Sequence, residues 1–138
     1  MRILMLHCDY FKSEMTEKTR SPLREETVSP VVEAENCLVV LAAVEKIDET
    51  DPTTTVGAAS DEIKKLAREL NVERIILHSF AHLFTKLATP HVALNVLQSI
   101  QTNLSKGNLT VLRTPFGWFN TLEVKAKGHP LSRVARQV

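Results

Sequence analysis

An unbroken apolar run, CLVVLAAV at residues 37–44, is the feature of this sequence that most constrains its fold. The polar stretch EAEN precedes the run, and EKIDETDP follows it. A strand with one face in solvent alternates polar and apolar residues, whereas a run without alternation is typical of a strand covered on both faces. The run therefore predicts a central strand in a sheet against which helices pack.

Other segments supply neighbours for this strand. MRILMLH alternates as an early strand does, and RIILHS has the composition of a short buried strand. With LTVLR and TLEVKAK, the predicted strands are residues 1–7, 74–79, 109–113 and 121–127. Residues 20–35 contain two prolines and many acids, so we expect a long loop or broken excursion there. After residue 127, GHPL is expected to turn the chain into a short basic tail.

Two segments have the period of helices. Apolar residues recur from Val56 to Leu70 with a spacing near 3.6, after a threonine cap region and before Asn71 as the stop. A second helix is predicted to open with Thr89 as its cap and Pro90 in the first position, and to close at Gly107. Its predicted buried stripe is Ala93, Leu97, Ile100 and Leu104. The sequence therefore predicts one α/β or α+β domain over residues 1–138, with helices on one face of a mixed sheet.

Charge and composition exclude several classes of protein. The net charge of +1 argues against a broad basic surface for nucleic acid. A local basic edge near the end, formed by Lys125, Lys127, Arg133 and Arg136, either holds a few phosphates or is a solvated face. No apolar run approaches about 18 residues, so no membrane span is expected, and the start is typical of a strand rather than of a signal peptide. The two cysteines match no metal or redox pattern and are expected to be buried thiols in a reducing cytoplasm.

Candidate polar residues lie where predicted strands end, whereas catalytic glycine and histidine motifs are absent. HSFAHL places His78 and His82 after a buried strand, HCD places His7 after the first strand, and KGHPL contains His129 in a predicted turn. Ligand sites in α/β folds gather at such strand ends. Each histidine could instead cap a loop, and the residues alone leave both interpretations open.

The stretch RTPFGWFN holds the only tryptophan of the chain and two of its five phenylalanines. Gly117 between bulky residues indicates a backbone that bends or is closely approached. The rings could stack on a nucleotide base or close the core. We therefore expect a pocket near residues 80–82 and 116–120.

Several motifs together resemble a known family. MRILMLHCDY, VEKIDE, SFAHL, PHVALNVLQSI, TPFGWFN and KGHPL resemble the N-terminal editing domain of archaeal threonyl-tRNA synthetase, over essentially all 138 residues. The resemblance implies a D-aminoacyl-tRNA deacylase-like fold and a proofreading hydrolase that removes serine from threonine tRNA while sparing threonyl-tRNA. It also implies that the 2′-OH of the terminal adenosine assists attack by water, without a metal or cofactor.

The resemblance further implies which residues form the site. His82 matches a pocket histidine that is expected to take part in catalysis. Asn120 stands where the family usually has lysine, and Arg133 stands where it usually has glutamate, so both occupy catalytic positions with altered chemistry. The residues expected to bind the substrate are Val44, Phe80, Ala81, His82, Phe116, Gly117, Trp118 and Phe119.

The expected partners are the 3′ end of threonine tRNA, a synthetase catalytic core in the same or a separate chain, and a second copy in a homodimer. The expected location is the cytoplasm, with no membrane contact. Two alternatives stay open: a non-catalytic tRNA-binding or assembly module that has lost the charged pair, and a D-aminoacyl-tRNA deacylase. The chain is either a fragment or part of a stand-alone editing protein.

Overall fold

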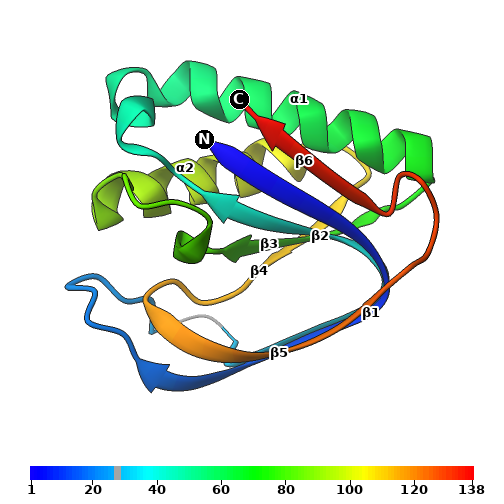
Figure 1. The fold of residues 1–138 in the computed structure, drawn as a ribbon, viewed down its shortest axis with the longest axis horizontal. Coiled ribbons are helices and arrows are strands. Elements are labelled where there is room, and N and C mark those ends of the chain that lie inside the picture. The colour runs from blue at the N-terminus through cyan, green and yellow to red at the C-terminus, as the bar shows by residue number, and fades with distance from the viewer. Residues whose placement is uncertain (27–28) are drawn as a thin grey trace.

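The computed structural model describes residues 1–26 and 29–138. These residues form one sheet with two α-helices, and two short 3₁₀ turns, η1 and η2 (Figure 1). In chain order the elements are β1 (Arg2–Lys18), β2 (Val31–Ala43), η1 (Lys46–Thr50), α1 (Pro52–Leu70), β3 (Arg74–Ser79), η2 (Ala81–Leu83), α2 (Pro90–Leu104), β4 (Thr110–Arg113), β5 (Trp118–Ala126) and β6 (Arg133–Gln137).

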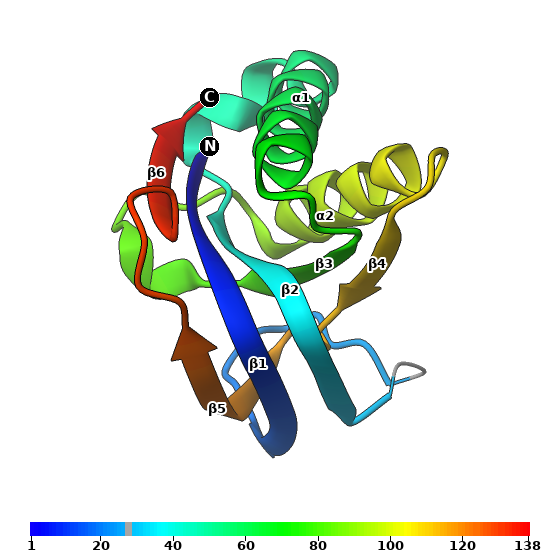
Figure 2. The ribbon, with the colours of Figure 1, turned by 90° about the vertical axis from the view of Figure 1, so that its right-hand side faces the viewer.

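The sheet is mixed, with strand order β4-β3-β2-β1-β5, and β6 also pairs with β1. The β2–β3 and β3–β4 pairs are parallel, and α1 and α2 make the two crossovers between them. Strand β1 pairs antiparallel with β2, β5 and β6. Both helices lie on the same side of the sheet (Figure 2), which confirms the predicted architecture.

Strand β2 is buried from Cys37 to its end, as the apolar run predicts. Leu38 and Val40 pack with the helices in the larger core cluster. Val39 and Leu41 belong to a second cluster that also contains Phe11 of β1. The far half of β1 and strand β5 curve away from the helices (Figure 1), so the sheet itself helps to enclose that second cluster.

The first two strands are longer than predicted. Strand β1 continues to Lys18, and β2 begins at Val31, so residues 31–35 of the predicted loop are strand. Their sequence VVEAE alternates, with Val32 and Ala34 buried and Glu33 exposed, which is the pattern of a half-buried strand. The high content of glutamate in this stretch is typical of a loop, so composition alone favours the wrong structure here. The loop prediction is correct for residues 20–26, 29 and 30, whereas residues 27 and 28 lie outside the described residues.

The helix boundaries are partly as predicted. Helix α1 ends at Leu70, and Asn71 is its C-cap, as the predicted stop. The left-handed backbone of Asn71 (φ 52°) directs its N–H to the carbonyls of Ala67 and Arg68. Its N-cap is Asp51 rather than a threonine, because the Asp51 carboxylate accepts the Thr54 N–H at 3.1 Å.

Helix α2 starts as predicted, with Thr89 as N-cap and Pro90 in the first turn, but its last residue is Leu104 and its C-cap is Ser105, before the predicted end at Gly107. Three of the four predicted stripe residues, Leu97, Ile100 and Leu104, are buried, and Ala93 is half-buried.

The predicted basic tail is a strand. Residues of β6 pair with the first residues of β1, from Arg2 opposite Gln137 to Leu6 opposite Arg133. Val134 is buried and the other four residues of β6 are exposed, so the strand contributes one side chain to the core. The main-chain groups of β6 pair with the first part of β1, because β5 pairs only with the later part of β1.

Cys8 and Cys37 are buried free thiols, as predicted, and they lie opposite each other in the β1–β2 pair. Burial raises the pKa of Cys8 to about 11 and the pKa of Cys37 to about 12. In residues 1–26 and 29–138, no helix combines the length and the apolarity that crossing a membrane requires.

Candidate functional site

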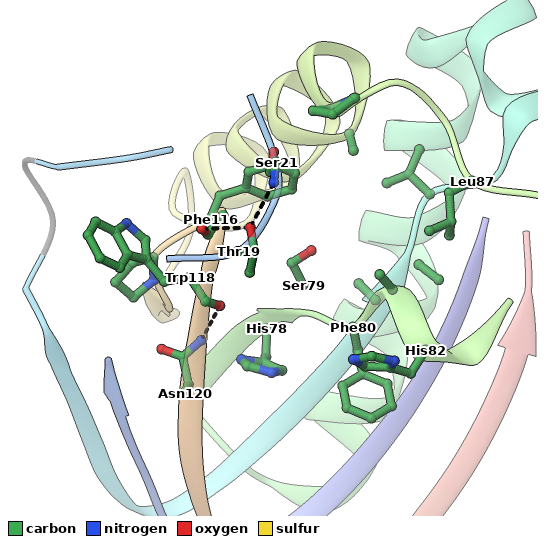
Figure 3. Close-up of a pocket in the computed structure, with 18 of the residues that line it drawn as sticks. Thr19, Ser21, His78, Ser79, Phe80, His82, Leu87, Phe116, Trp118 and Asn120 are labelled. Atoms are coloured by element: carbon green, nitrogen blue, oxygen red, sulfur yellow. Dashed lines mark hydrogen bonds between the residues drawn. The ribbon is translucent and has the colours of Figure 1, made fainter. Parts of the chain in front are cut away.

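A cavity of about 450 Å³ lies at the edge of the sheet where β2 and β3 end (Figure 3). Because these strands are parallel, their carboxyl ends meet at the same edge. The segment after η2, the start of α2 and the segment between β4 and β5 complete the walls. The lining comes from residues 19 and 21, residues 42–44, residues 78–82, Leu87, Ala88, Pro90 and Ala93, and residues 115–120 with Leu122.

The cavity brings together almost all of the residues that the sequence resemblance singles out. Those on its lining are Val44, Phe80, Ala81, His82, Phe116, Gly117, Trp118, Phe119 and Asn120. Arg133 is not among the lining residues: it is exposed at the start of β6, paired with Leu6 of β1. The roles of these residues stay predictions, but three separate segments of the chain meet where one ligand could contact them.

His82 lies on the exposed rim of the cavity, in the 3₁₀ turn after β3. Its ring meets the ring of Phe80 edge to face, with centroids 5.6 Å apart (Figure 3). The Phe80 N–H donates to the Ala42 carbonyl of β2 at 2.8 Å, which extends the strand pairing into the turn. His82 is therefore accessible to both ligand and solvent.

His78 also lines the cavity, but its environment differs from that of His82. It is buried, and its Nδ1 lies 2.8 Å from the hydroxyl of Thr114, just beyond β4. Burial lowers the pKa of His78 to about 4, so the ring is neutral near pH 7. His78 is thus an uncharged part of the wall, poorly suited to accept a proton at neutral pH.

The aromatic stretch contributes both to the core and to the cavity wall. Phe116 is buried in the larger core cluster and also lines the cavity. Trp118 is half-buried, and its indole N–H donates to the Glu25 carbonyl at 2.8 Å. Phe119 is 52% exposed on the rim. Phe116 therefore closes the core, as one of the two interpretations predicts, whereas Phe119 lies exposed on the cavity lining, and its stacking on a base stays a prediction.

Residues 18–25, which we call the strap, hold this stretch in place. The main-chain N–H and the hydroxyl of Thr19 both donate to the Gly117 carbonyl, at 3.2 and 2.9 Å. The Glu25 N–H donates to the Phe116 carbonyl at 3.1 Å. Sequence reasoning placed most of the strap in an undifferentiated loop, and the alternation of small or anchoring residues at 19, 21, 23 and 25 is the signal that could have identified it.

Gly117 is the tightest point between the strap and the cavity wall. Its φ is +82°, and a Cβ at this position would lie 2.3 Å from the Leu23 carbonyl oxygen. Only glycine allows both the left-handed backbone and this approach. The sequence-based expectation of a closely approached backbone is confirmed, although the approaching group is the strap.

The Glu25 carboxylate anchors the far end of the strap. It pairs with the Arg113 guanidinium, through both of its oxygens, and accepts the Phe116 N–H at 3.0 Å. The side chains of Arg113 and Glu25 are only 6% and 12% exposed. Burial by itself would raise the pKa of Glu25, but the bonds from Arg113 and the Phe116 amide lower it below its ordinary value.

The Asn120 side chain is tied back to its own strand. Its side-chain N–H₂ donates to the Trp118 carbonyl at 3.0 Å (Figure 3). Its Oδ1 is buried and has no hydrogen-bond partner among the described residues. An amide held in this way has neither the charge nor the reach of the lysine that the family usually carries.

The other histidine candidates meet outside the cavity lining. His7 Nδ1 lies 2.9 Å from His129 Nε2, and Lys127 pairs with Asp9 beside them. Burial lowers the pKa of His7. In the described part of the chain, no group of three or more histidine, cysteine or acidic side chains is arranged to hold a metal.

The basic edge predicted near the end is partly neutralised. Lys127 pairs with Asp9, and Arg136 pairs with Glu62 at 3.0 Å. Because two of its four cations have acidic partners, the structure favours a solvated face over a phosphate site at this edge.

Comparison with known proteins connects the cavity to a family. Residues 1–138 match the family model of the archaea-specific editing domain of threonyl-tRNA synthetase. The threonine–tRNA ligases of Methanopyrus kandleri, Methanococcus aeolicus and Methanocaldococcus jannaschii are 41%, 39% and 38% identical to the chain over all of its 138 residues. The match covers 22% of each ligase, so the chain spans about a fifth of these relatives.

A solved structure supports the fold independently. The c-Myc DNA Unwinding Element Binding Protein has a TM-score of 0.66 at 11% identity, over 100% of this chain and 99% of that one. At this identity the similarity concerns the fold alone. It confirms the expected mixed α+β fold of the D-aminoacyl-tRNA deacylase type.

Replacing Gly117 with alanine is expected to destabilise the protein and displace the strap. The left-handed backbone costs alanine about 1–2 kcal/mol, and the overlap with Leu23 adds about 1–3 kcal/mol. Urea unfolding measures the loss, with Gly57→Ala as the control. Gly57 lies in α1 with nothing near its Cβ position, so that change should stabilise by up to about 1 kcal/mol. Equal stability of the two variants would contradict the close approach.

The lowered pKa of His78 is expected to reduce the free energy of unfolding in acid. Between the unfolded pKa of about 6.5 and the folded pKa of about 4, the unfolded chain binds more protons than the folded one. This contribution to stability is complete above pH 6.5 and falls by about 3 kcal/mol as the pH reaches 4. Unfolding free energies measured across this range should decline less steeply in His78→Gln. The exposed His91→Gln is the matched control, and it should keep the wild-type slope.

Proposed function

The chain belongs to the archaea-specific editing domains of threonyl-tRNA synthetase, and from this premise we propose that it hydrolyses seryl-tRNA(Thr) and spares threonyl-tRNA(Thr). Membership of the family gives it a proofreading role in protein synthesis. The choice of substrate and the mechanism below are our proposal. The 3′ end of the tRNA enters the cavity, and a water molecule cleaves the ester between serine and the terminal ribose.

The need for such a site follows from the size of a methyl group. Serine lacks only one methyl group of threonine, and a missing methyl is worth only about 1–3 kcal/mol of discrimination in a binding pocket. A synthetic site that accepts threonine therefore also charges some serine. A second site with a different selection can remove that serine after transfer to the tRNA.

The observation that carries the proposal is the cavity itself. Its volume of about 450 Å³ is in the range of small-molecule sites, which run from about 300 to 1,000 Å³. The motif residues that the resemblance assigns to substrate binding line it from two sides, with the segment after β3 facing the segment before β5. An aminoacyl-adenosine end could lie between these segments.

The side chains near the cavity favour chemistry assisted by the substrate. His78 is held neutral, and Asn120 is an uncharged amide that gives one N–H to the Trp118 carbonyl. His82 on the rim can position a group but has no carboxylate hydrogen-bonded to its ring among the described residues. The ribose 2′-OH, adjacent to the ester, is therefore the group we assign to orient the water.

The proposed step balances without a cofactor. The water oxygen bonds to the ester carbonyl carbon, and the bond from that carbon to the ribose oxygen breaks. One water proton passes to the ribose oxygen, which leaves as a hydroxyl. Serine departs with a free carboxylate, and the second proton of the water is released to solvent.

The partners we propose are the 3′ end of threonine tRNA and a threonyl-tRNA synthetase core. The relatives carry the matched region as 22% of a longer ligase, which supports a core joined to the domain in one chain. A homodimer stays part of the proposal.

A non-catalytic tRNA-binding module is the second candidate. The engagement of Asn120 with Trp118, and the position of Arg133 away from the cavity lining, favour it. Removal of D-amino acids, a third possibility, is separated from the first by comparing D- and L-seryl-tRNA.

Single-turnover deacylation tests the proposal. We expect rapid loss of serine, and little loss of threonine, from tRNA carrying the threonine anticodon. The same seryl-tRNA ending in 2′-deoxyadenosine should react at least about 100-fold more slowly, since it lacks the assisting group. Stable seryl-tRNA in the presence of protein that still binds it would instead support the non-catalytic module.

Asn120→Lys separates an active site from a degenerate one. If the substrate carries the chemistry, restoring the lysine should change the rate by less than about tenfold. A gain of about 10²–10³, the usual worth of one electrostatic group, would indicate that the wild-type site is degenerate. Asn120→Met, of similar length but uncharged, controls for loss of the bond to Trp118.

A further inference from the structure

The strap has two sides with different chemistry. Its odd-numbered residues from Thr19 to Glu25 are half-buried, and its even-numbered residues are exposed. The inward side contains the anchors that hold the aromatic stretch. The outward side carries three cations, Lys18, Arg20 and Arg24.

The inward anchors hold the strap against the cavity, with the outward side on its outer surface. Thr19 and Ser21 line the cavity themselves, on the side of Phe116 (Figure 3). The buried pair of Glu25 with Arg113 fixes the end of the strap. A segment anchored in this way presents its exposed side chains at a constant position relative to the cavity.

The three cations have no acidic partner within 4.0 Å among the described residues. Six of the 17 lysines and arginines have such a partner, so the three share this state with other surface cations and differ from them by lying on a segment that lines the cavity. Lys18 Nζ lies 5.8 Å from the centre of the Trp118 ring, and Arg24 donates to the Ser21 carbonyl at 3.2 Å. Lys18 and Arg24 are thus held against the cavity wall and the strap, respectively. Neither contact neutralises the positive charge, which can still attract an anion from outside.

We propose that Lys18, Arg20 and Arg24 bind the backbone phosphates of the nucleotides that precede the terminal adenosine. This inference rests on the proposed function, because it requires an RNA 3′ end in the cavity. An RNA strand whose last nucleoside enters the cavity must leave it at the mouth, where its phosphates meet the strap. Phosphate contacts position a nucleic acid without reading its sequence, which suits a site defined by the aminoacyl end.

The exposed acids Glu17 and Glu26 flank the cations, so the outward side is not uniformly basic. This pattern favours a few local phosphate contacts over a general attraction for polyanions. It also agrees with the net charge of +1 for the whole chain. Affinity for RNA is therefore expected to depend on these positions rather than on total charge.

The test compares two probes on one triple variant, Lys18→Gln with Arg20→Gln and Arg24→Gln. The first probe is an RNA minihelix ending in CCA, and the second is seryl-3′-aminoadenosine, which has no preceding phosphate and is not hydrolysed. Three contacts to a single strand contribute about −2 to the slope of log K against log salt concentration. For the minihelix, the slope of the variant should be shallower than that of wild type by about 2. For the small analogue, the variant should bind within twofold of wild type.

A matched control removes the same charge elsewhere. Lys65, Arg68 and Lys106 are exposed and do not line the cavity. Their triple glutamine variant should keep the wild-type slope and affinity for both probes. Equal loss of minihelix affinity in the two triple variants would overturn the assignment, because total charge would then explain the binding.

Single variants keep the proposal testable if the triple change disturbs the strap. Each should reduce the salt slope by about 0.7, and the absence of any reduction would overturn it. Competition by a polyglutamate peptide as effective as the minihelix would overturn the assignment to RNA. Failure of wild type to bind the small analogue would count against the proposed function, whereas a lost minihelix slope in the variant concerns the phosphate contacts alone.

Discussion

Burial of strand β2 on both faces is the constraint on which the rest of the structure depends. Its apolar side chains require one cover from α1 and α2 and another on the opposite face, where the sheet curves. The two helices can cover the same face because they are successive crossovers between parallel strands. This arrangement brings the ends of β2 and β3 to one edge, and the cavity forms there.

The cavity wall is held by a polar anchor, Glu25. Glu25 meets Arg113, the Phe116 amide and the Trp118 indole, the last through its carbonyl. Breaking a buried pair leaves an uncompensated charge, at a cost of about 3–5 kcal/mol. The same segment that holds the wall from within presents its cations outside, so the shape of the cavity and the approach to it share one support.

Patterns local in the chain were sufficient for much of the fold. The run at residues 37–44, the period of α1 and the Thr89-Pro90 start of α2 each depend on neighbouring residues, and all three are confirmed. The start of β2 has only a short alternation among acidic residues, and β6 buries a single side chain, so neither segment has a strong local strand pattern. Both segments are strands because β1 supplies partners for their main-chain groups.

The sequence by itself determined the buried centre, the helices and the motifs of the editing family, since each is carried by a contiguous stretch. Tertiary structure alone decided which polar residues share a site. His78 and Thr114 meet in the cavity wall, whereas His7 and His129 meet outside its lining. Glu25 and Arg113 are 88 residues apart, and no local pattern pairs them. Such contacts depend on strand register and on the path of the loops, which form only when distant segments pack together.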